Sequence, residues 1–178
     1  MKAIKLLILI VLSLSVYFIY NYTNKTTKIL IVGDKQITKI KPTFSNNKVI
    51  INNKYASKKL STKDLLKKIK LERNIKRYLI ESHYLILSIG YNDLVYDLSL
   101  EDNINNHHYN KITESIENDY NKLIKEIRKY YKNKIIVIGY SRSKKEDYYL
   151  NIGIRKLNQI LKNNKEVEDK IINEILAK

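Results

Sequence analysis

Three short apolar segments, each closed by a glycine, constrain the fold of this chain more than any other feature. They are residues 28–32, 84–89 and 134–138, and the glycines that follow them are Gly33, Gly90 and Gly139. A continuous apolar run of this length is typical of a strand that is covered on both faces. Residues 49–52 are predicted to form a further short strand. Three of the four glycines in the chain therefore fall where a predicted strand ends.

The segments between the predicted strands have the spacing of helices. Ser61 and Asp64 resemble a capping box, and the apolar positions after them predict one helix that continues to Leu79. Helices are also predicted at 111–131, about 147–163 and 166–177, with a polar loop at about 99–110. Strands that alternate with helices predict an α/β fold, in which a doubly wound parallel sheet is covered by helices.

The formal net charge of +16 is concentrated in one third of the chain. Residues 24–80 hold 14 Lys and 2 Arg against three acidic residues, whereas residues 81–178 carry only +1. A field of this size attracts anionic lipid, anionic cell-wall polymer or nucleic acid. An alternative stays open, because the abundance of Lys, Asn, Ile and Tyr also fits a codon usage rich in A and T.

The N-terminus is predicted to be a membrane anchor. Residues 6–20 are apolar and uncharged, and Lys2 and Lys5 precede them. With its flanking residues the span reaches roughly 18–20 residues, enough to cross a bilayer. A cleaved signal peptide is the alternative, but no small residues mark a cleavage site after the run. We therefore expect a single-pass signal anchor at 1–23 in the cell membrane. Lys2, Lys5 and the shortness of the segment before the run favour an extracytoplasmic body, 24–178, whereas four lysines just beyond the run favour the opposite orientation: Lys25, Lys28, Lys35 and Lys39.

Metals and cofactors are not expected. The chain has no cysteine, which excludes disulfides, thiolate metal sites and cysteine nucleophiles. His107 and His108 are adjacent, lack further ligands at a metal-binding spacing, and are predicted to be loop residues. His83 precedes an apolar strand and is predicted to be a boundary residue.

Polar residues follow two of the predicted strands, at the edge where such sheets place their ligand sites. Gly33, Asp34 and Lys35 follow the first strand. The later strand at 84–89 runs into Gly90-Tyr91-Asn92-Asp93. In order and spacing, the chain from about residue 28 to residue 163 resembles the SGNH/GDSL hydrolases.

The resemblance implies a flavodoxin-like three-layer α/β fold and ester hydrolysis. In that family the first block is Gly-Asp-Ser, whose serine is the nucleophile. The asparagine of its Gly-x-Asn-Asp block donates a hydrogen bond to the oxyanion, so the resemblance makes Asn92 the oxyanion-hole candidate. Asn92 has an alternative role in capping the turn after the strand, with Asp93 starting the next helix.

The departures from the family pattern concern its chemistry. Lys35 stands where the family has its nucleophilic serine. The segment before Ser61 has Lys59 near the place where the family has an oxyanion-hole glycine. The family's Asp-x-x-His block near the C-terminus is missing, since residues 163–178 contain no histidine. Acyl transfer needs an activated hydroxyl and its base, so the sequence predicts a catalytically inactive site.

Three functions stay open. The first is a non-catalytic binding or scaffold module at the cell envelope, with carbohydrate or acylated material as its ligand. The second is an active ester hydrolase or acetylesterase with a rearranged site, for which Ser141 or Ser143 is a conceivable nucleophile. The third is an electrostatic binder of anionic lipid or wall polymer through residues 24–80. Nucleic acid is not an expected partner, and the sequence does not determine the oligomeric state.

Overall fold

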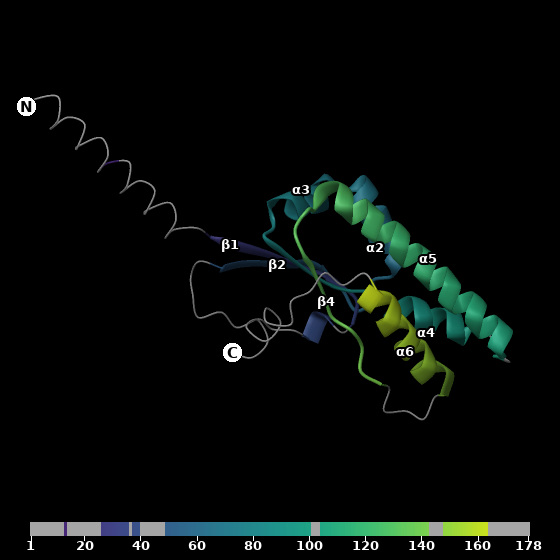
Figure 1. Ribbon diagram of the computed structural model, residues 1–178. Coiled ribbons are helices and arrows are strands. Elements are labelled where there is room, and N and C mark those ends of the chain that lie inside the picture. The colour runs from purple at the N-terminus through teal and green to yellow at the C-terminus, as the bar shows by residue number, and fades with distance from the viewer. Residues whose placement is uncertain are drawn as a thin grey trace, which may run out of the picture.

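The protein is an α/β domain built on four strands. The computed structural model describes residues 13, 26–35, 37–39, 49–100, 104–142 and 148–163. The elements are β1 (Thr27–Gly33), η1 (Ile37–Lys39), β2 (Val49–Ala56), α2 (Thr62–Leu71), α3 (Arg73–Glu81), β3 (Tyr84–Ser88), α4 (Tyr91–Ser99), α5 (Asn106–Tyr130), β4 (Ile135–Val137) and α6 (Tyr148–Asn163) (Figure 1). All four predicted strands are confirmed, and β2 is longer than predicted.

The sheet is parallel throughout, with the strand order β2-β1-β3-β4. The chain first moves outward from β1 to β2 and then returns past β1 to β3 and β4, which confirms the predicted parallel α/β architecture. Parallel strands end at the same edge, so Gly33 pairs with Ser88, and Leu87 with Val137, near the ends of their strands. This edge carries the residues that the family resemblance singles out.

The main core lies between one face of the sheet and the helices. Leu30, Leu85 and Ile135 point to this face, and buried residues of all five helices α2–α6 belong to the same cluster. Alternate residues such as Ile31 and Ile86 point to the other face, where Ile37 of η1 packs among the described residues. The sequence predicts helices on both faces of the sheet. For the face that carries Ile31 and Ile86, this stays a prediction.

The predicted single helix from Ser61 to Leu79 is wrong, because it is two helices. Glu72 interrupts it with an extended backbone (φ −89°, ψ 121°), which ends α2 and begins α3. Ile69 and Ile75 flank the break and are 1% and 0% exposed. In a continuous helix six residues turn through about 600°, which would direct these two side chains about 120° apart. The break turns both towards the core.

The predicted loop at 99–110 is also wrong in its second half. Asn105 is the N-cap of α5, and its side chain accepts a hydrogen bond of 2.9 Å from the backbone N–H of His108. His107 and His108 therefore lie in the first turn of a helix. An asparagine side chain can accept a hydrogen bond from a free N–H group at a helix start. Asn105 is therefore the residue that could have predicted this helix start.

The anchor predicted at 1–23 and the helix predicted at 166–177 lie outside the described residues, apart from Ser13. Within the described ranges, no helix combines the length and the apolar character that crossing a bilayer requires. The division into an anchor and a body stays a prediction.

Candidate functional site

The ends of β1 and β3 approach each other so closely that only glycine fits. Gly33 has φ +149°, and a Cβ atom there would lie 1.9 Å from the backbone oxygen of Ser88. The next residue, Asp34, donates its N–H to the same Ser88 oxygen at 2.8 Å. Glycine is therefore needed at position 33 for sheet geometry, whatever chemistry follows it.

Asp34 is a fully buried carboxylate that joins three strand ends. Its Oδ2 accepts hydrogen bonds from the Tyr91 N–H at 3.0 Å and from the Tyr140 hydroxyl at 2.7 Å. Tyr91 follows β3 and Tyr140 follows β4, so one side chain holds the ends of β1, β3 and β4 together. A buried carboxyl group needs such partners, because burial without them is unfavourable.

Tyr140 was not among the residues singled out from the sequence. Burial, together with the Asp34 carboxylate, raises its pKa well above the usual value for tyrosine. Its ring stacks on Tyr91 with the centroids 5.4 Å apart, and the fully buried Ser88 hydroxyl lies beside the phenol. The signal that could have found it is its position directly after Gly139, at a strand end. The rings of Tyr91 and Tyr140 and the Asp34 carboxylate therefore lie together at the ends of β1, β3 and β4.

Lys35, which occupies the nucleophile position of the family pattern, is exposed. Its backbone oxygen accepts a hydrogen bond of 2.9 Å from the Thr38 hydroxyl, which holds the turn into η1. An exposed ammonium group is strongly hydrated, whereas a nucleophilic lysine needs an apolar environment.

The side-chain amide of Asn92, the oxyanion-hole candidate, binds the protein's own backbone. Its Nδ2 donates to the carbonyl oxygen of Lys58 at 2.9 Å and to that of Leu60 at 2.8 Å. A primary amide has two N–H groups, so these two bonds use its full donor capacity. Asn92 thereby ties the start of α4 to the loop between β2 and α2. In this arrangement the side-chain amide of Asn92 has no N–H left to donate to an oxyanion.

Asp93 and Gly90 also serve the local structure. Asp93 Oδ2 accepts from the backbone N–H of Thr62 at 2.9 Å and from its hydroxyl at 2.7 Å, at the first turn of α2. A carboxylate at a helix N-terminus is favourable. Gly90 is the N-cap of α4 and has φ +115°, a left-handed conformation that favours glycine. These contacts fasten α4 and α2 to the strand ends.

The remaining sequence candidates lie at several different places in the fold. His83 lies at the start of β3 and accepts a hydrogen bond at Nδ1 from the Lys28 N–H at 3.0 Å, at the opposite end of the sheet. His107 and His108 lie in the first turn of α5. Ser141 is exposed after β4, and Ser143 is outside the described residues. The part of the chain that the structure describes contains no cluster of acidic or histidine side chains suited to a metal ion.

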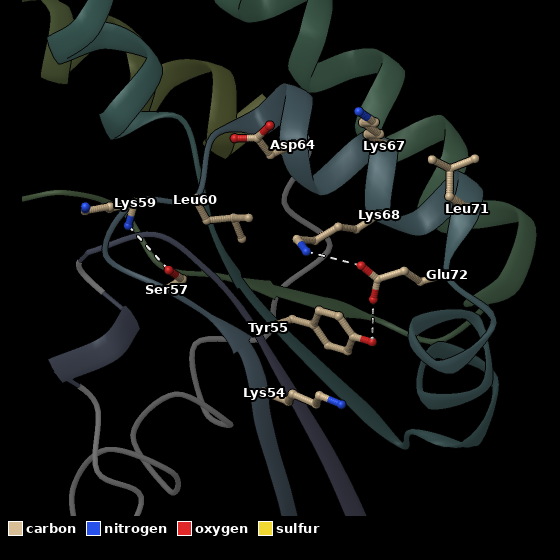
Figure 2. A pocket seen from close by; sticks show the side chains of 10 residues that line it. All are labelled: Lys54, Tyr55, Ser57, Lys59, Leu60, Asp64, Lys67, Lys68, Leu71 and Glu72. Carbon is tan, nitrogen blue, oxygen red and sulfur yellow. Dashed lines mark hydrogen bonds and ion pairs between the residues drawn. The ribbon is translucent and has the colours of Figure 1, made fainter.

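A groove of about 800 Å³ lies beside the edge strand β2, between it and α2 (Figure 2). Four lysines line it, together with Asp64 and Glu72: Lys54, Lys59, Lys67 and Lys68. It belongs to the basic third of the chain. The lysines of the groove come from β2, from α2 and from the short loop between them, so the groove gathers part of the charge of residues 24–80 at one place.

One end of this groove is held by a chain of hydrogen bonds. Glu72 accepts from the Tyr55 hydroxyl at 3.0 Å and pairs with the Lys68 ammonium at 3.1 Å. The Lys68 hydrogen bond, with that of Tyr55, lowers the pKa of Glu72. Burial, reinforced by Glu72, raises the pKa of Tyr55 to about 12. Glu72 is therefore charged at neutral pH and neutralises Lys68.

Comparisons with known proteins support the fold. No protein-family model matches this sequence, and no curated protein matches it significantly. Among solved structures, the lipase Lip_vut3 from a goat rumen metagenome has a TM-score of 0.63 at 14% identity, covering 78% of this chain and 75% of that one.

Two further structures are similar over the same part of the chain. A member of the lipolytic G-D-S-L family from Veillonella parvula has a TM-score of 0.52 at 15% identity, covering 78% of this chain and 72% of that one. A catalytic mutant of Axe2, an acetylxylan esterase from Geobacillus stearothermophilus, has a TM-score of 0.53 at 14% identity, covering 78% and 71%. The parallel sheet, the order of its blocks and these similarities together show that the chain has an SGNH/GDSL hydrolase-like fold.

Proposed function

We propose that this protein is a non-catalytic SGNH/GDSL-like module that binds or scaffolds material at the cell envelope. The observation that carries the proposal is the use of both Asn92 amide hydrogens by the backbone oxygens of Lys58 and Leu60. An oxyanion hole requires donors aimed at the reacting oxygen and not already bonded elsewhere. The exposed lysine at position 35 adds a second argument, since it supplies no hydroxyl.

The ligand proposed for the module is carbohydrate or acylated envelope material. One structural neighbour is a lipase and another is an acetylxylan esterase. The proposed ligand follows from this likeness of fold.

The proposed location is the outer face of a membrane, with residues 1–23 as a retained anchor. The support is the uncharged apolar run at 6–20 after Lys2 and Lys5. Washing membranes with alkaline carbonate should leave the full chain in the pellet, and a shortened soluble product would refute the anchor. Protease added to intact cells should digest the body, and protection would reverse the proposed orientation.

Catalysis is tested by hydrolysis of a short-chain aryl ester with the full chain in a neutral detergent. The Asn92→Ala and Lys35→Ser variants are measured beside it, with far-UV circular dichroism to correct for the folded fraction. We expect all three proteins to give the same background rate, because hydroxyl, base and donors are lacking together. Turnover by the natural chain that Asn92→Ala abolishes would overturn the proposal. It would favour an ester hydrolase with a rearranged site.

A further inference from the structure

The groove between β2 and α2 has more positive than negative side chains, since four lysines line it against Asp64 and Glu72. Lys68 is neutralised by Glu72 at 3.1 Å. Asp64 accepts a hydrogen bond of 2.7 Å from the Ser61 hydroxyl at the start of α2. Lys54, Lys59 and Lys67 form no ion pair within the described residues and are exposed.

We propose that this groove binds a linear anionic polymer whose charges are phosphodiester groups. The inference rests on the proposed binding function and adds to it a second ligand class, bound at the groove between β2 and α2. Three lysines without ion pairs around one depression raise the local concentration of an anion. A polymer engages them together, so that each contact after the first is intramolecular.

The cations of the groove suit separate anionic groups such as phosphodiesters. The residues that line it include four lysines and no arginine. Arginine presents a planar fork that matches a carboxylate or a phosphate with two hydrogen bonds, whereas the lysine ammonium is a compact point charge that binds an anionic oxygen without a fixed geometry. A flexible polymer with a single charge on each repeating unit fits such separate point charges.

The shape of the groove favours a slim chain over a membrane surface. Figure 2 shows Lys54 on β2 across from the α2 residues Lys67 and Lys68, with Lys59 towards the other end. Between them lie Tyr55 and Leu60, each only 6% exposed. A flat bilayer meets the rim of a depression, whereas a single polymer strand enters between β2 and α2. Apolar atoms of the polymer backbone can then pack on Leu71, which also lines the groove and is 71% exposed.

Glu72 limits the affinity of the groove. Its carboxylate repels an entering phosphate and holds Lys68 through an ion pair. Glu72→Gln removes this charge and releases Lys68, so it should strengthen polymer binding about fivefold, the effect of one charge near an anionic partner. Lys54→Gln should weaken binding by about the same factor.

The test measures binding of polyglycerol phosphate to the full chain in a neutral detergent, by isothermal calorimetry at several salt concentrations. With about three lysine–phosphate contacts, affinity should fall about 20-fold between 50 and 200 mM salt. The matched control is Lys156→Gln. Lys156 is an exposed residue of α6, the helix that follows β4, and β4 and β2 stand at opposite ends of the strand order.

The proposal requires Lys54→Gln to weaken binding, Glu72→Gln to strengthen it, and Lys156→Gln to leave it unchanged. Equal losses of affinity in Lys54→Gln and Lys156→Gln would overturn it, because binding would then depend on the net charge of the protein and not on the groove. A second arm uses mixed micelles that contain phosphatidylglycerol. Binding to these micelles that depends on Lys54, with no binding of the polymer, would overturn it in favour of lipid. None of these outcomes depends on the ester hydrolysis assay, so the two proposals fail separately.

Discussion

The hydrogen bond from Tyr140 to Asp34 predicts a loss of stability in Tyr140→Phe whose size depends on pH. Tyr140→Phe removes a hydroxyl that donates at 2.7 Å to a fully buried carboxylate and leaves the ring in place. A hydrogen bond to a charged group stabilises a protein by about 1.5–3 kcal/mol. We therefore expect the variant to lose about 2 kcal/mol of unfolding free energy at pH 7.

Above pH 10 this difference should shrink. Burial raises the pKa of Tyr140 well above its ordinary value, so the folded phenol stays protonated where the unfolded one ionises. A group with a raised folded pKa stabilises the protein fully below its unfolded pKa and loses that contribution as the pH rises. The loss is about 1.4 kcal/mol per pH unit above about pH 10. The Phe variant has no such loss, so its deficit should narrow by about 1.4 kcal/mol between pH 7 and pH 11.

The assay is urea unfolding of both proteins at several pH values between 7 and 11, followed by far-UV circular dichroism. Tyr148→Phe is the control, because Tyr148 is 70% exposed and should change stability by less than about 0.5 kcal/mol at any pH. The reasoning is refuted if Tyr140→Phe matches the control at pH 7. A deficit that stays constant up to pH 11 would refute the role assigned to burial.

Two further predictions concern the strand ends. Asn92→Ala should lower the unfolding free energy by about 2 kcal/mol, since it breaks two hydrogen bonds to Lys58 and Leu60; urea unfolding checks this, and an unchanged midpoint would contradict it. Gly33→Ala should prevent folding, because its Cβ would meet the Ser88 backbone oxygen at 1.9 Å. Gly153→Ala is the comparison, since its Cβ meets only the side chain of Leu94, which can move; resistance to limited proteolysis should separate the two variants.

The strands and their ends could be predicted because the information is local. A run such as residues 84–89 is apolar at every position except Ser88, and a glycine follows it, so the strand and its end are both marked in the sequence. The helix break at Glu72 could not be found this way. The break allows both Ile69 and Ile75 to face the same core. At the break, the Glu72 carboxylate accepts a hydrogen bond from Tyr55, which lies on β2.

The site shows the same division between local and distant causes. Gly33, Asp34, Asn92 and Asp93 could be singled out because they form short blocks at predicted strand ends. Their contacts could not be predicted. The Asp34–Tyr140 bond joins residues 106 positions apart. The groove between β2 and α2 depends on how the helix lies against the strand, which the residue pattern does not give.

The strand order has a consequence for how the chain folds as it is made. β1 is the second strand of the sheet, yet its partner β3 follows much later, since Ile29 pairs with Tyr84. At a synthesis rate of about 5–20 residues per second, the apolar β1 waits about 3–11 s for that partner. Pairing between distant segments also closes a long loop and is slow. The chain therefore passes through a stage in which α2 and α3 can form while β1 still lacks one neighbour, and in that interval β1 is the segment most exposed to association with other chains.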